Sequence, residues 1–552
     1  MDQSLVKSLK DCWAREGQRL EDHLLEVASS AGSPGGSPTK RLDFLAGLLH
    51  DAGKARPSWQ SYFERSLRDE PGLDKLPHAY FGAALFALYA RTLLDNDETT
   101  PEIEQRYYLL VQDLQDHHGR LRDRTKPPTT VKIPWQDSMK GYPPNDAFFA
   151  DLDSLLHRFF PALPLYIGDY KTFSAMLDQL EKTWERHVNR QTMRLSKVTG
   201  GAPQAYAHWI CRDVTGNLIS ADRLSASALT DKSGALPPEK AKDALQTFKT
   251  TLNKEFQKAI KKGQRLMADK RRSVHEQTLA SYLRHQDTSW FTLNLPVGWG
   301  KTFISLRIAL ESVIAGHTER IIYVAPYLAI LSQAAKDIHE ATGLEVLEHH
   351  HLALLNNTPN KDWKSEEKSE EKSEDLDVLT MESWRAPIVA TTFNQLFRAI
   401  FPASAQQSIR IPALQRAFVI VDEPQIINVG VYNAFLKGLD VLRERQCAQV
   451  MLVTATLPPT KYGLSEAPYD LTPPVESANR YKIVTCTEPW KEQRLVDEAL
   501  NRLENYKQVA VILNTIADAI NVYWRIKNKL GAVDKHFCLS LHGMMEAVRE
   551  IV

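Results

Sequence analysis

The stretch FTLNLPVGWGKTFISLRIAL, residues 291–310, reads as a short apolar strand, a glycine-containing turn and a helix. In the turn PVGWGKT, Gly298 and Gly300 let backbone amides come close to a phosphate group. Lys301 can reach the β- and γ-phosphates of a nucleotide, and the Thr302 hydroxyl can bind Mg²⁺. We therefore expect an α/β domain with a phosphate-binding loop at the end of one strand.

Short β-rich runs alternate with helical stretches on both sides of this loop. They are FTLNL, RIIYVA, APIVAT, AFVIVDE and AQVMLVTAT, followed later by QVAVILN and HFCLSL. Such alternation predicts a parallel sheet covered by helices on both faces, and a second sheet is expected to begin near residue 480. The run AFVIV leads into Asp422 and Glu423. These two carboxylates therefore follow the carboxyl end of a strand, which is where α/β sheets present their ligand sites. We expect Asp422 to hold Mg²⁺ and Glu423 to polarise the attacking water.

The first 230 residues, by contrast, show apolar residues at spacings of three and four, which predicts an all-α region. Within it lies an adjacent pair, His50 and Asp51, with further histidines following and a late aspartate. This pattern suits a one- or two-metal hydrolase, and the imidazole and carboxylate ligands suit Mn, Fe, Co or Ni. The candidate ligands are His23, His50, Asp51, His78, His117, His118 and Asp222. A further run, residues 349–351, is also all histidine, and we assign it to a loop.

Composition narrows the class of protein. Hydrophobic residues are 43% and charged residues 25% of the 552, which excludes disordered, collagen-like and coiled-coil chains. The 68 Lys and Arg balance the 68 Asp and Glu, so charge does not indicate the partner. The five cysteines form no CxxC pair, and neither an export signal nor an apolar membrane span stands out. We expect a cytoplasmic protein of about three domains with no membrane partner.

Two segments lack an obvious place in these domains. The basic run KEFQKAIKKGQRLMADKRR, residues 254–272, is either a DNA contact or a solvated linker helix. The tract KSEEKSEEKSED, residues 364–375, contains no apolar residue and is expected to be a solvated insertion.

Three elements taken in order, GxGKT, Asp-Glu and TAT, resemble motifs I, II and III of superfamily-two helicases. In that comparison Gln277 suits an adenine-contacting glutamine. The segments VAPYLAI (324–330) and ATTFNQL (390–396) resemble the strand-contacting motifs Ia and Ib. The resemblance implies that DNA sugar-phosphate contacts come from Pro326, Tyr327, Thr391 and Thr392.

The string HDAGKARPSWQSYF, residues 50–63, resembles the HD phosphohydrolase superfamily. That resemblance implies one metal held by His23, His50, Asp51 and Asp222. It implies a second metal held by His78, His117 and His118, with Asp51 bridging the two. Lys54 matches the HDxGK pattern and would steady the scissile phosphate.

An HD nuclease followed by a superfamily-two helicase resembles the signature helicase-nuclease of type I CRISPR-Cas interference, over essentially the whole chain. The resemblance implies recruitment to an R-loop by a guide-RNA surveillance complex and nicking of the displaced strand. ATP hydrolysis would then draw single-stranded DNA 3′ to 5′ into the nuclease site.

On this basis we expect four segments: an HD nuclease over 1–235, accessory helices over 236–275, a first RecA-like domain over 276–478 and the start of a second over 479–552. Motif II departs from the family pattern, because Gln425 stands where an aspartate or histidine is usual. The chain stops at Val552 before any segment resembling motifs V or VI. We therefore expect weak ATP hydrolysis by this chain alone, and a second chain that completes the helicase would fit the same pattern.

Two other functions fit the residues. The chain could be an HD nucleotide phosphohydrolase whose ATP-binding domain is regulatory, or a shortened, non-enzymatic docking partner of the surveillance complex. Product release from nucleotides without DNA would identify the first. Unchanged complex binding without any cleavage would identify the second.

Overall fold

The structure is a computed structural model, which describes residues 8–68, 70, 76–95, 100–119, 121, 146–196, 216–225, 234–350, 376–446, 448–458, 460, 464–475 and 484–530. The chain divides into two compact units, Met1–Val475 and Glu476–Val552. Among the described residues, none of the helices combines the length and apolar character that crossing a membrane requires.

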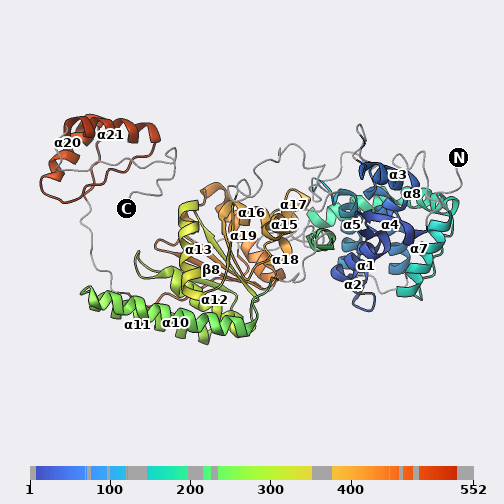
Figure 1. The fold of residues 1–552 in the computed structure, drawn as a ribbon, viewed down its shortest axis with the longest axis horizontal. Helices are drawn as coiled ribbons and strands as arrows, with labels where there is room; N and C mark the ends of the chain where they lie inside the picture. Colours follow the sequence, from blue (N-terminus) through green and yellow to red (C-terminus); the bar gives the residue numbers. More distant parts are fainter. Residues whose placement is uncertain are drawn as a thin grey trace. The chain divides into compact units, whose positions relative to one another are not determined.

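The N-terminal part of the first unit is helical, as the spacing of its apolar residues predicts (Figure 1). Ser37 accepts a hydrogen bond from the Lys40 amide at the start of one helix, and Thr100 accepts one from the Ile103 amide at the start of another. The helices are α1 (Leu20–Ala31), α2 (Pro38–Leu49), α3 (Pro57–Ser66), α4 (Ala79–Asp95), α5 (Pro101–Asp116), α7 (Asp146–Phe159) and α8 (Tyr170–Ser196). Residues 216–225 form a further helix.

Short elements complete this part: the antiparallel strands β1 (Trp13–Arg15) and β2 (Gln18–Arg19), and the 3₁₀ turns η2 (Leu9–Asp11) and η3 (Ala52–Ala55). One continuous apolar cluster joins the helices, so the side chains at their ends are held by a packed core.

The second part of the unit is built on a seven-stranded, fully parallel sheet in the order β5-β6-β4-β7-β8-β3-β9. Five strands lie where the apolar runs predict them: β3 (Trp290–Asn294), β4 (Arg320–Ala325), β6 (Ile388–Thr392), β7 (Ala417–Asp422) and β8 (Gln449–Thr454). The edge strands β5 (Val346–His349) and β9 (Tyr469–Asp470) were not predicted. The loop assignment of His349 is therefore wrong, because this residue ends β5 and is fully buried.

Helices cover both faces of this sheet (Figure 1). One apolar cluster lies under α10 (Pro238–Lys261), α11 (Arg265–Arg284), α12 (Lys301–Ile314) and α13 (Leu328–Thr342). The other lies mainly under α16 (Phe393–Ile400), α18 (Ile411–Leu414) and α19 (Val429–Gln446). The remaining short elements are α15 (Leu376–Glu382), α17 (Ala405–Ser408) and η5 (Pro424–Ile426).

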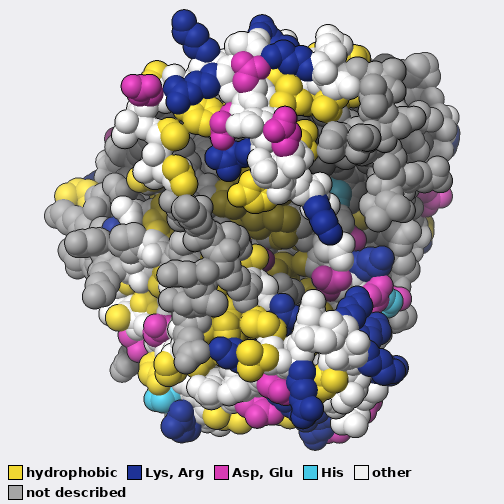
Figure 2. All heavy atoms as spheres, turned by 90° about the vertical axis from the view of Figure 1, so that its left-hand side faces the viewer, with side chains coloured by type: hydrophobic (Ala, Val, Ile, Leu, Met, Phe, Trp, Pro, Cys, Tyr) yellow, Lys and Arg dark blue, Asp and Glu magenta, His cyan; other side chains and the backbone are white. Residues whose placement is uncertain are grey.

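The basic run of residues 254–272 forms the adjoining ends of α10 and α11. The chain reverses at Gly263, whose φ of 75° is costly for residues with a side chain. Apolar residues of α10, among them Ala241 and Phe248, are buried in the domain core, so these helices pack on the sheet domain. On the face of the molecule drawn in Figure 2, Lys and Arg side chains are mixed with acidic ones in the lower part of the view.

The second unit contains α20 (Glu492–Leu503) and α21 (Ile516–Leu530), which pack together through Val496, Ala499 and Val522. The run QVAVILN, residues 508–514, is not a strand, so that prediction is wrong. A strand needs a hydrogen-bonded neighbour, and the described residues of this unit supply none. The predicted strand HFCLSL and the tract KSEEKSEEKSED lie outside the described residues.

Candidate functional site

The candidate metal ligands come from five helical segments. His23 lies on α1, His50 caps the end of α2, His78 precedes α4, and His117 follows α5 directly. Asp222 lies on the helix of residues 216–225. All seven predicted ligands converge in the structure, and they form two groups that share Asp51.

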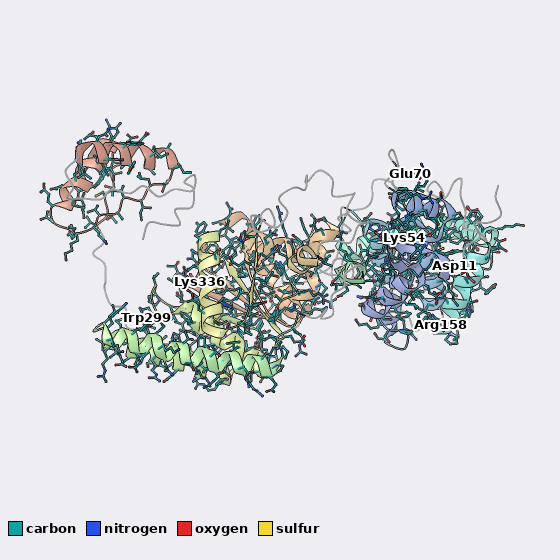
Figure 3. All side chains as sticks on the ribbon, viewed as in Figure 1. Asp11, Lys54, Glu70, Arg158, Trp299 and Lys336 are labelled. Atoms are coloured by element: carbon teal, nitrogen blue, oxygen red, sulfur yellow. The ribbon has the colours of Figure 1, made fainter. Side chains whose placement is uncertain are left out.

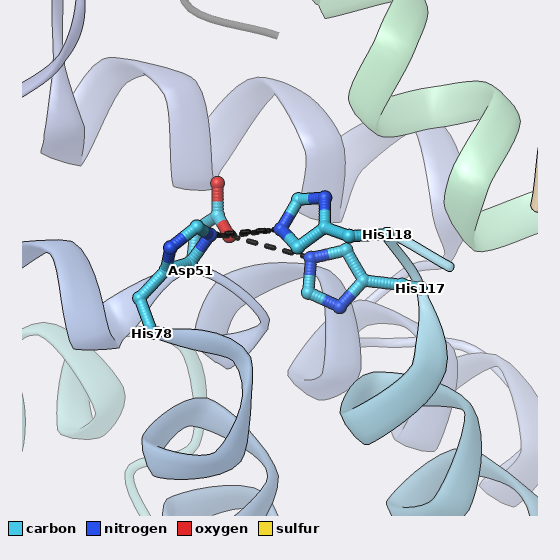
Figure 4. A group of neighbouring side chains, drawn as sticks. All are labelled: Asp51, His78, His117 and His118. Carbon is cyan, nitrogen blue, oxygen red and sulfur yellow. Dashed lines mark hydrogen bonds and ion pairs between the residues drawn. The ribbon is translucent and has the colours of Figure 1, made fainter. Parts of the chain in front are cut away.

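The two oxygens of Asp51 face different groups of ligands. Its Oδ1 lies 3.2 Å from Nε2 of His78, 3.4 Å from Nε2 of His117 and 3.8 Å from Nε2 of His118 (Figure 4). Its Oδ2 lies 3.3 Å from Nε2 of His23 and 3.5 Å from Nε2 of His50. Asp51 therefore has the geometry of a bridging carboxylate.

Asp222 closes the second group. Its Oδ1 lies 3.3 Å from Nε2 of His23 and 3.5 Å from Nε2 of His50. The ligand atoms of each group lie within 4.8 Å of one another, a spacing that one metal ion can bridge.

The hydrogen bonds around the cluster fix which imidazole nitrogen faces it. The Nδ1 of His50 lies 2.7 Å from the Gly47 carbonyl, and the Nδ1 of His117 lies 2.7 Å from the Leu114 carbonyl. A carbonyl only accepts, so these nitrogens carry the protons and each Nε2 presents a lone pair. Among the residues that the structure describes, the Nε2 atoms of His50 and His117, and Oδ1 of Asp51, are buried without hydrogen-bond partners. Buried acceptors that face one another in this way fit a cation between them.

Charges in the cluster shift the pKa values of its members. Burial opposes ionisation of Asp51, but Lys54, His50 and His78 outweigh it and hold the Asp51 pKa well below its ordinary value. Burial also opposes the charged form of His50, yet Asp51 and Asp222 raise the pKa of His50. Burial lowers the pKa of His78. The aspartates are thus held ionised, as metal binding requires.

Two cationic side chains adjoin the ligands. The ammonium of Lys54 lies 2.6 Å from Oδ2 of Asp51, and Figure 3 places Lys54 within the N-terminal helical part. Arg15, which we did not predict, has Nη2 at 3.2 Å from Nδ1 of His23 and at 3.7 Å from Oδ1 of Asp222. Arg15 ends strand β1, and the packing of this strand brings it to the cluster. No sequence pattern records that packing, so the sequence could not indicate Arg15.

The phosphate-binding loop, residues 296–302, lies between β3 and α12. Gly298 and Gly300 have φ values of 85° and 79°, which favour glycine at both positions. Trp299 is buried in the domain core, beside α11 in Figure 3, and so points away from the phosphate-binding side. His275 packs behind Gly300, and burial lowers the pKa of His275 to about 4.

Motifs II and III meet the loop at the strand ends, because β7, β8 and β3 are neighbours in the sheet. Lys301 donates a short hydrogen bond to Glu423 Oε1. Gln425 donates to Glu423 Oε2 at 2.7 Å, and the Thr454 hydroxyl lies 2.7 Å from Oε1 of Gln425. Gln425, the unusual residue of motif II, therefore links motif II to motif III.

Asp422 has a partner that the sequence did not reveal. The Tyr323 hydroxyl, on β4, donates to Oδ2 of Asp422 at 2.6 Å. Burial raises the pKa of Asp422 above its ordinary value, whereas the bonds from Gln425, Lys301 and Thr454 outweigh burial and lower that of Glu423. In the sequence, only the alternation of side chains along β4 could have indicated that Tyr323 contacts Asp422.

A cavity of about 650 Å³ lies beside the loop, between α10, α11 and α12. Its lining combines basic and aromatic side chains with Gly298 and Gly300, and includes Phe248, Phe303, Lys249, Arg272 and Arg307. Gln277 does not line this cavity; its exposed amide donates to the Ser273 hydroxyl on the same helix at 2.9 Å. Its contact with adenine stays a prediction.

The predicted DNA contacts differ in accessibility. Pro326 and Tyr327 follow β4, and Tyr327 is 57% exposed. Thr392 caps α16, and its hydroxyl accepts from the Gln395 amide at 3.4 Å. Thr391 is fully buried and donates to the His349 carbonyl at 3.0 Å. The Thr391 hydroxyl is thus not at the surface in this structure, and its contact with DNA stays a prediction.

The helix of residues 216–225 joins the metal cluster to the sheet domain. While Asp222 faces the histidines, the Ser220 hydroxyl accepts a bond from Nη2 of Arg385 at 3.1 Å. Ile219 and Leu224 share a small apolar cluster with Leu379 and Ile409 of the sheet domain. The candidate metal ligand Asp222 is thus carried on a helix that also contacts the sheet domain.

Comparisons with known proteins agree with the motifs. Residues 272–463 match the DEAD/DEAH box helicase family. The chain is 26% identical over 482 residues to the CRISPR-associated nuclease/helicase Cas3 of Haloferax volcanii, covering 80% of this chain and 48% of that protein. It thus spans about half the length of that relative.

Matches among solved structures include Cas3 of T. fusca, at 18% identity and a TM-score of 0.47, covering 81% of this chain and 50% of that one. Another is a CRISPR RNA-guided surveillance complex before nicking, at 18% identity and a TM-score of 0.37, covering 81% and 48%. The resemblance to a Cas3-like helicase-nuclease that the motifs indicate is confirmed by the curated relative and the helicase-family match.

Proposed function

We propose that the N-terminal helical part is a metal-dependent nuclease for single-stranded DNA, and that the sheet domain is part of an ATP-driven 3′ to 5′ motor that delivers the strand. The observation that carries the nuclease proposal is the pair of ligand groups that share Asp51. A carboxylate with one oxygen toward each group suits two metals acting together on one phosphate.

In the nuclease, His23, His50, Asp51 and Asp222 would hold one Mn, Fe, Co or Ni ion, and His78, His117 and His118 would hold a second with Asp51. Bound there, two such ions supply an activated water and neutralise charge on the scissile phosphate. Lys54, beside Asp51, is placed to pair with a phosphate oxygen. The histidines present Nε2 lone pairs because backbone carbonyls hold Nδ1 of His50 and His117.

In the motor, Lys301 would bind the β- and γ-phosphates of ATP, and Thr302 and Asp422 would hold Mg²⁺. Glu423 would orient the attacking water. The pairing of Lys301 with Glu423 must change when Lys301 turns to a phosphate, and Gln425 and Thr454 contact the same carboxylate. Motif III would then sense that change.

The biological setting follows from the resemblance alone. The relative from Haloferax volcanii is described as a CRISPR-associated nuclease/helicase. We infer that this chain also acts in CRISPR interference, on an R-loop opened by a guide-RNA surveillance complex. Sequence choice would then belong to the guide, and this protein would need only backbone contacts, from Pro326, Tyr327 and Thr392.

The test is cleavage of circular single-stranded DNA by the purified chain with Mn²⁺ and without ATP. We expect wild-type protein to cut, and His50→Ala and Asp51→Ala to lose at least about 100-fold in rate, since even the neighbours of metal ligands account for 10- to 100-fold effects. A matched control is Asp43→Asn, which alters a buried carboxylate paired with Arg106 outside the cluster. This variant should keep cutting while it is folded.

Other outcomes would support a different function. Failure of folded, metal-loaded wild-type protein to cut DNA would contradict the proposal. Release of product from nucleotides under the same conditions would favour a nucleotide phosphohydrolase. Binding to the surveillance complex with neither reaction would favour a docking role.

A further inference from the structure

We infer that Ser225 and Glu26 are positioning residues that fix the tautomer of His23 and so tune one of the two metal sites. The inference rests on the proposed metal sites and deepens them. Ser225 lies one helical turn after Asp222 on the helix of residues 216–225, and its side chain is buried.

The Ser225 hydroxyl has three polar side chains around it. Its Oγ lies 2.8 Å from Oε2 of Glu26, 3.0 Å from Nδ1 of His23 and 3.1 Å from Nε2 of Gln18. A hydroxyl has one hydrogen to donate and two lone pairs that accept. These three contacts use its capacity completely.

Only one arrangement of hydrogens satisfies all three. The Gln18 amide nitrogen is a donor only, and the Glu26 carboxylate is an acceptor only. The Ser225 hydrogen must therefore go to Glu26, and Ser225 must accept from both Gln18 and His23. This requires the His23 proton on Nδ1 and leaves a lone pair on Nε2.

That Nε2 is the atom that faces the cluster, 3.3 Å from Oδ2 of Asp51 and 3.3 Å from Oδ1 of Asp222. His50 and His117 reach the same tautomer through backbone carbonyls, which no substitution of their side-chain neighbours removes. Among the described residues no backbone carbonyl accepts from His23, and Nδ1 of His23 contacts the Ser225 side chain instead. The tautomer of His23 can therefore be changed by replacing a neighbouring side chain, which is not possible for His50 and His117.

Arg15 also approaches His23, but it does not compete for the Nδ1 position. Its Nη2 lies 3.2 Å from Nδ1 and 3.5 Å from Nε2 of the ring. A donor in the ring plane along one nitrogen's lone pair would be much farther from the other nitrogen. Arg15 thus lies over the ring face, and the in-plane position at Nδ1 belongs to Ser225.

The test is a titration of EDTA-stripped chain with Mn²⁺ by calorimetry, which resolves the two sites separately. Ser225→Ala should weaken one of the two Mn²⁺ sites by about 10- to 100-fold and leave the other unchanged, because His23 belongs to only one ligand group. Ser225→Thr keeps the hydroxyl and should restore most of the affinity. Glu26→Ala should weaken the same site, because the serine hydrogen is then released to compete for His23.

Ser220→Ala is the matched control, since it removes a buried hydroxyl of the same helix that contacts Arg385 instead of the cluster. It should bind Mn²⁺ like wild-type protein. Wild-type affinity in Ser225→Ala or Glu26→Ala, equal weakening of both sites, or the same loss in Ser220→Ala would each overturn the inference. Absence of Mn²⁺ binding by wild-type protein would instead contradict the proposed metal sites.

Discussion

The metal cluster and the nucleotide site each set a lysine against a carboxylate, but their surroundings differ. Lys54 faces Asp51, whose side chain is fully buried among histidines from separate helices. Lys301 faces Glu423, whose side chain is 22% exposed at the end of the sheet. Removing an ion from water costs several kcal/mol. The ionised form of the buried Asp51 therefore depends far more on neighbouring charges than that of the partly exposed Glu423.

The difference shows where each site obtains its precision. The candidate metal ligands are held by a packed helical core and by hydrogen bonds to Nδ1 atoms. The nucleotide site relies on local backbone: a glycine turn, a helix start and three adjacent strand ends. We expect the first site to respond strongly to metal and the second to respond to single side chains of its loop.

The largest expected effect is metal stabilisation of the N-terminal part. At Mn²⁺ one hundred times above its Kd, linkage gives about 2.7 kcal/mol per site, which corresponds to roughly 5–10 °C in the Tm of that part. Scanning calorimetry with Mn²⁺ and with EDTA measures it. Asp51→Ala should abolish the shift, and an equal shift in that variant would show that Mn²⁺ binds elsewhere.

Next in size is the effect of Lys301→Ala on nucleotide binding. A hydrogen bond to a charged group contributes about 1.5–3 kcal/mol, so the affinity for a fluorescent ATP analogue should fall by about tenfold or more. Lys336→Ala, an exposed lysine on α13, is the matched control. Cleavage of single-stranded DNA without ATP should not change in Lys301→Ala. A parallel loss of cleavage would mean that the two sites are not separable.

The smallest expected effect is on the pH dependence of stability, and it concerns two buried histidines, one in the helical part and one in the sheet domain. Burial lowers the pKa of His187, on α8, to about 4, as it does for His275 on α11. An unfolded histidine titrates near 6.5, so between about pH 6.5 and 4 the unfolded chain binds more protons and stability falls as the pH falls. Each histidine should account for about 1–2 kcal/mol of loss between pH 7 and 5.

Urea unfolding at pH 7, 6 and 5 checks this prediction. His187→Gln should flatten the pH dependence of the helical part only, and His275→Gln that of the sheet domain only. If either variant keeps the wild-type slope, that histidine is protonated in the folded protein.

Much of the molecule follows from local sequence. The turn at Gly298 and Gly300, the strand that ends at Asp422 and the helical N-terminal part were all predicted, because they depend on residues within one or two elements. The strand predicted at residues 508–514 failed because a strand needs a partner outside its own segment. His349 was misplaced in a loop because an edge strand of four residues gives little periodic signal.

The sequence by itself determined the chemistry of the two candidate sites: the histidines and aspartates, the glycine turn with Lys301, and the paired carboxylates. Only the tertiary structure decided their partners. It directed the two oxygens of Asp51 toward different histidines, brought Tyr323 to Asp422 and placed Ser225 against His23 and Glu26, which lies 199 residues away in the chain. Such contacts depend on how helices and strands pack in three dimensions, and residue spacing along the chain carries no direct record of that packing.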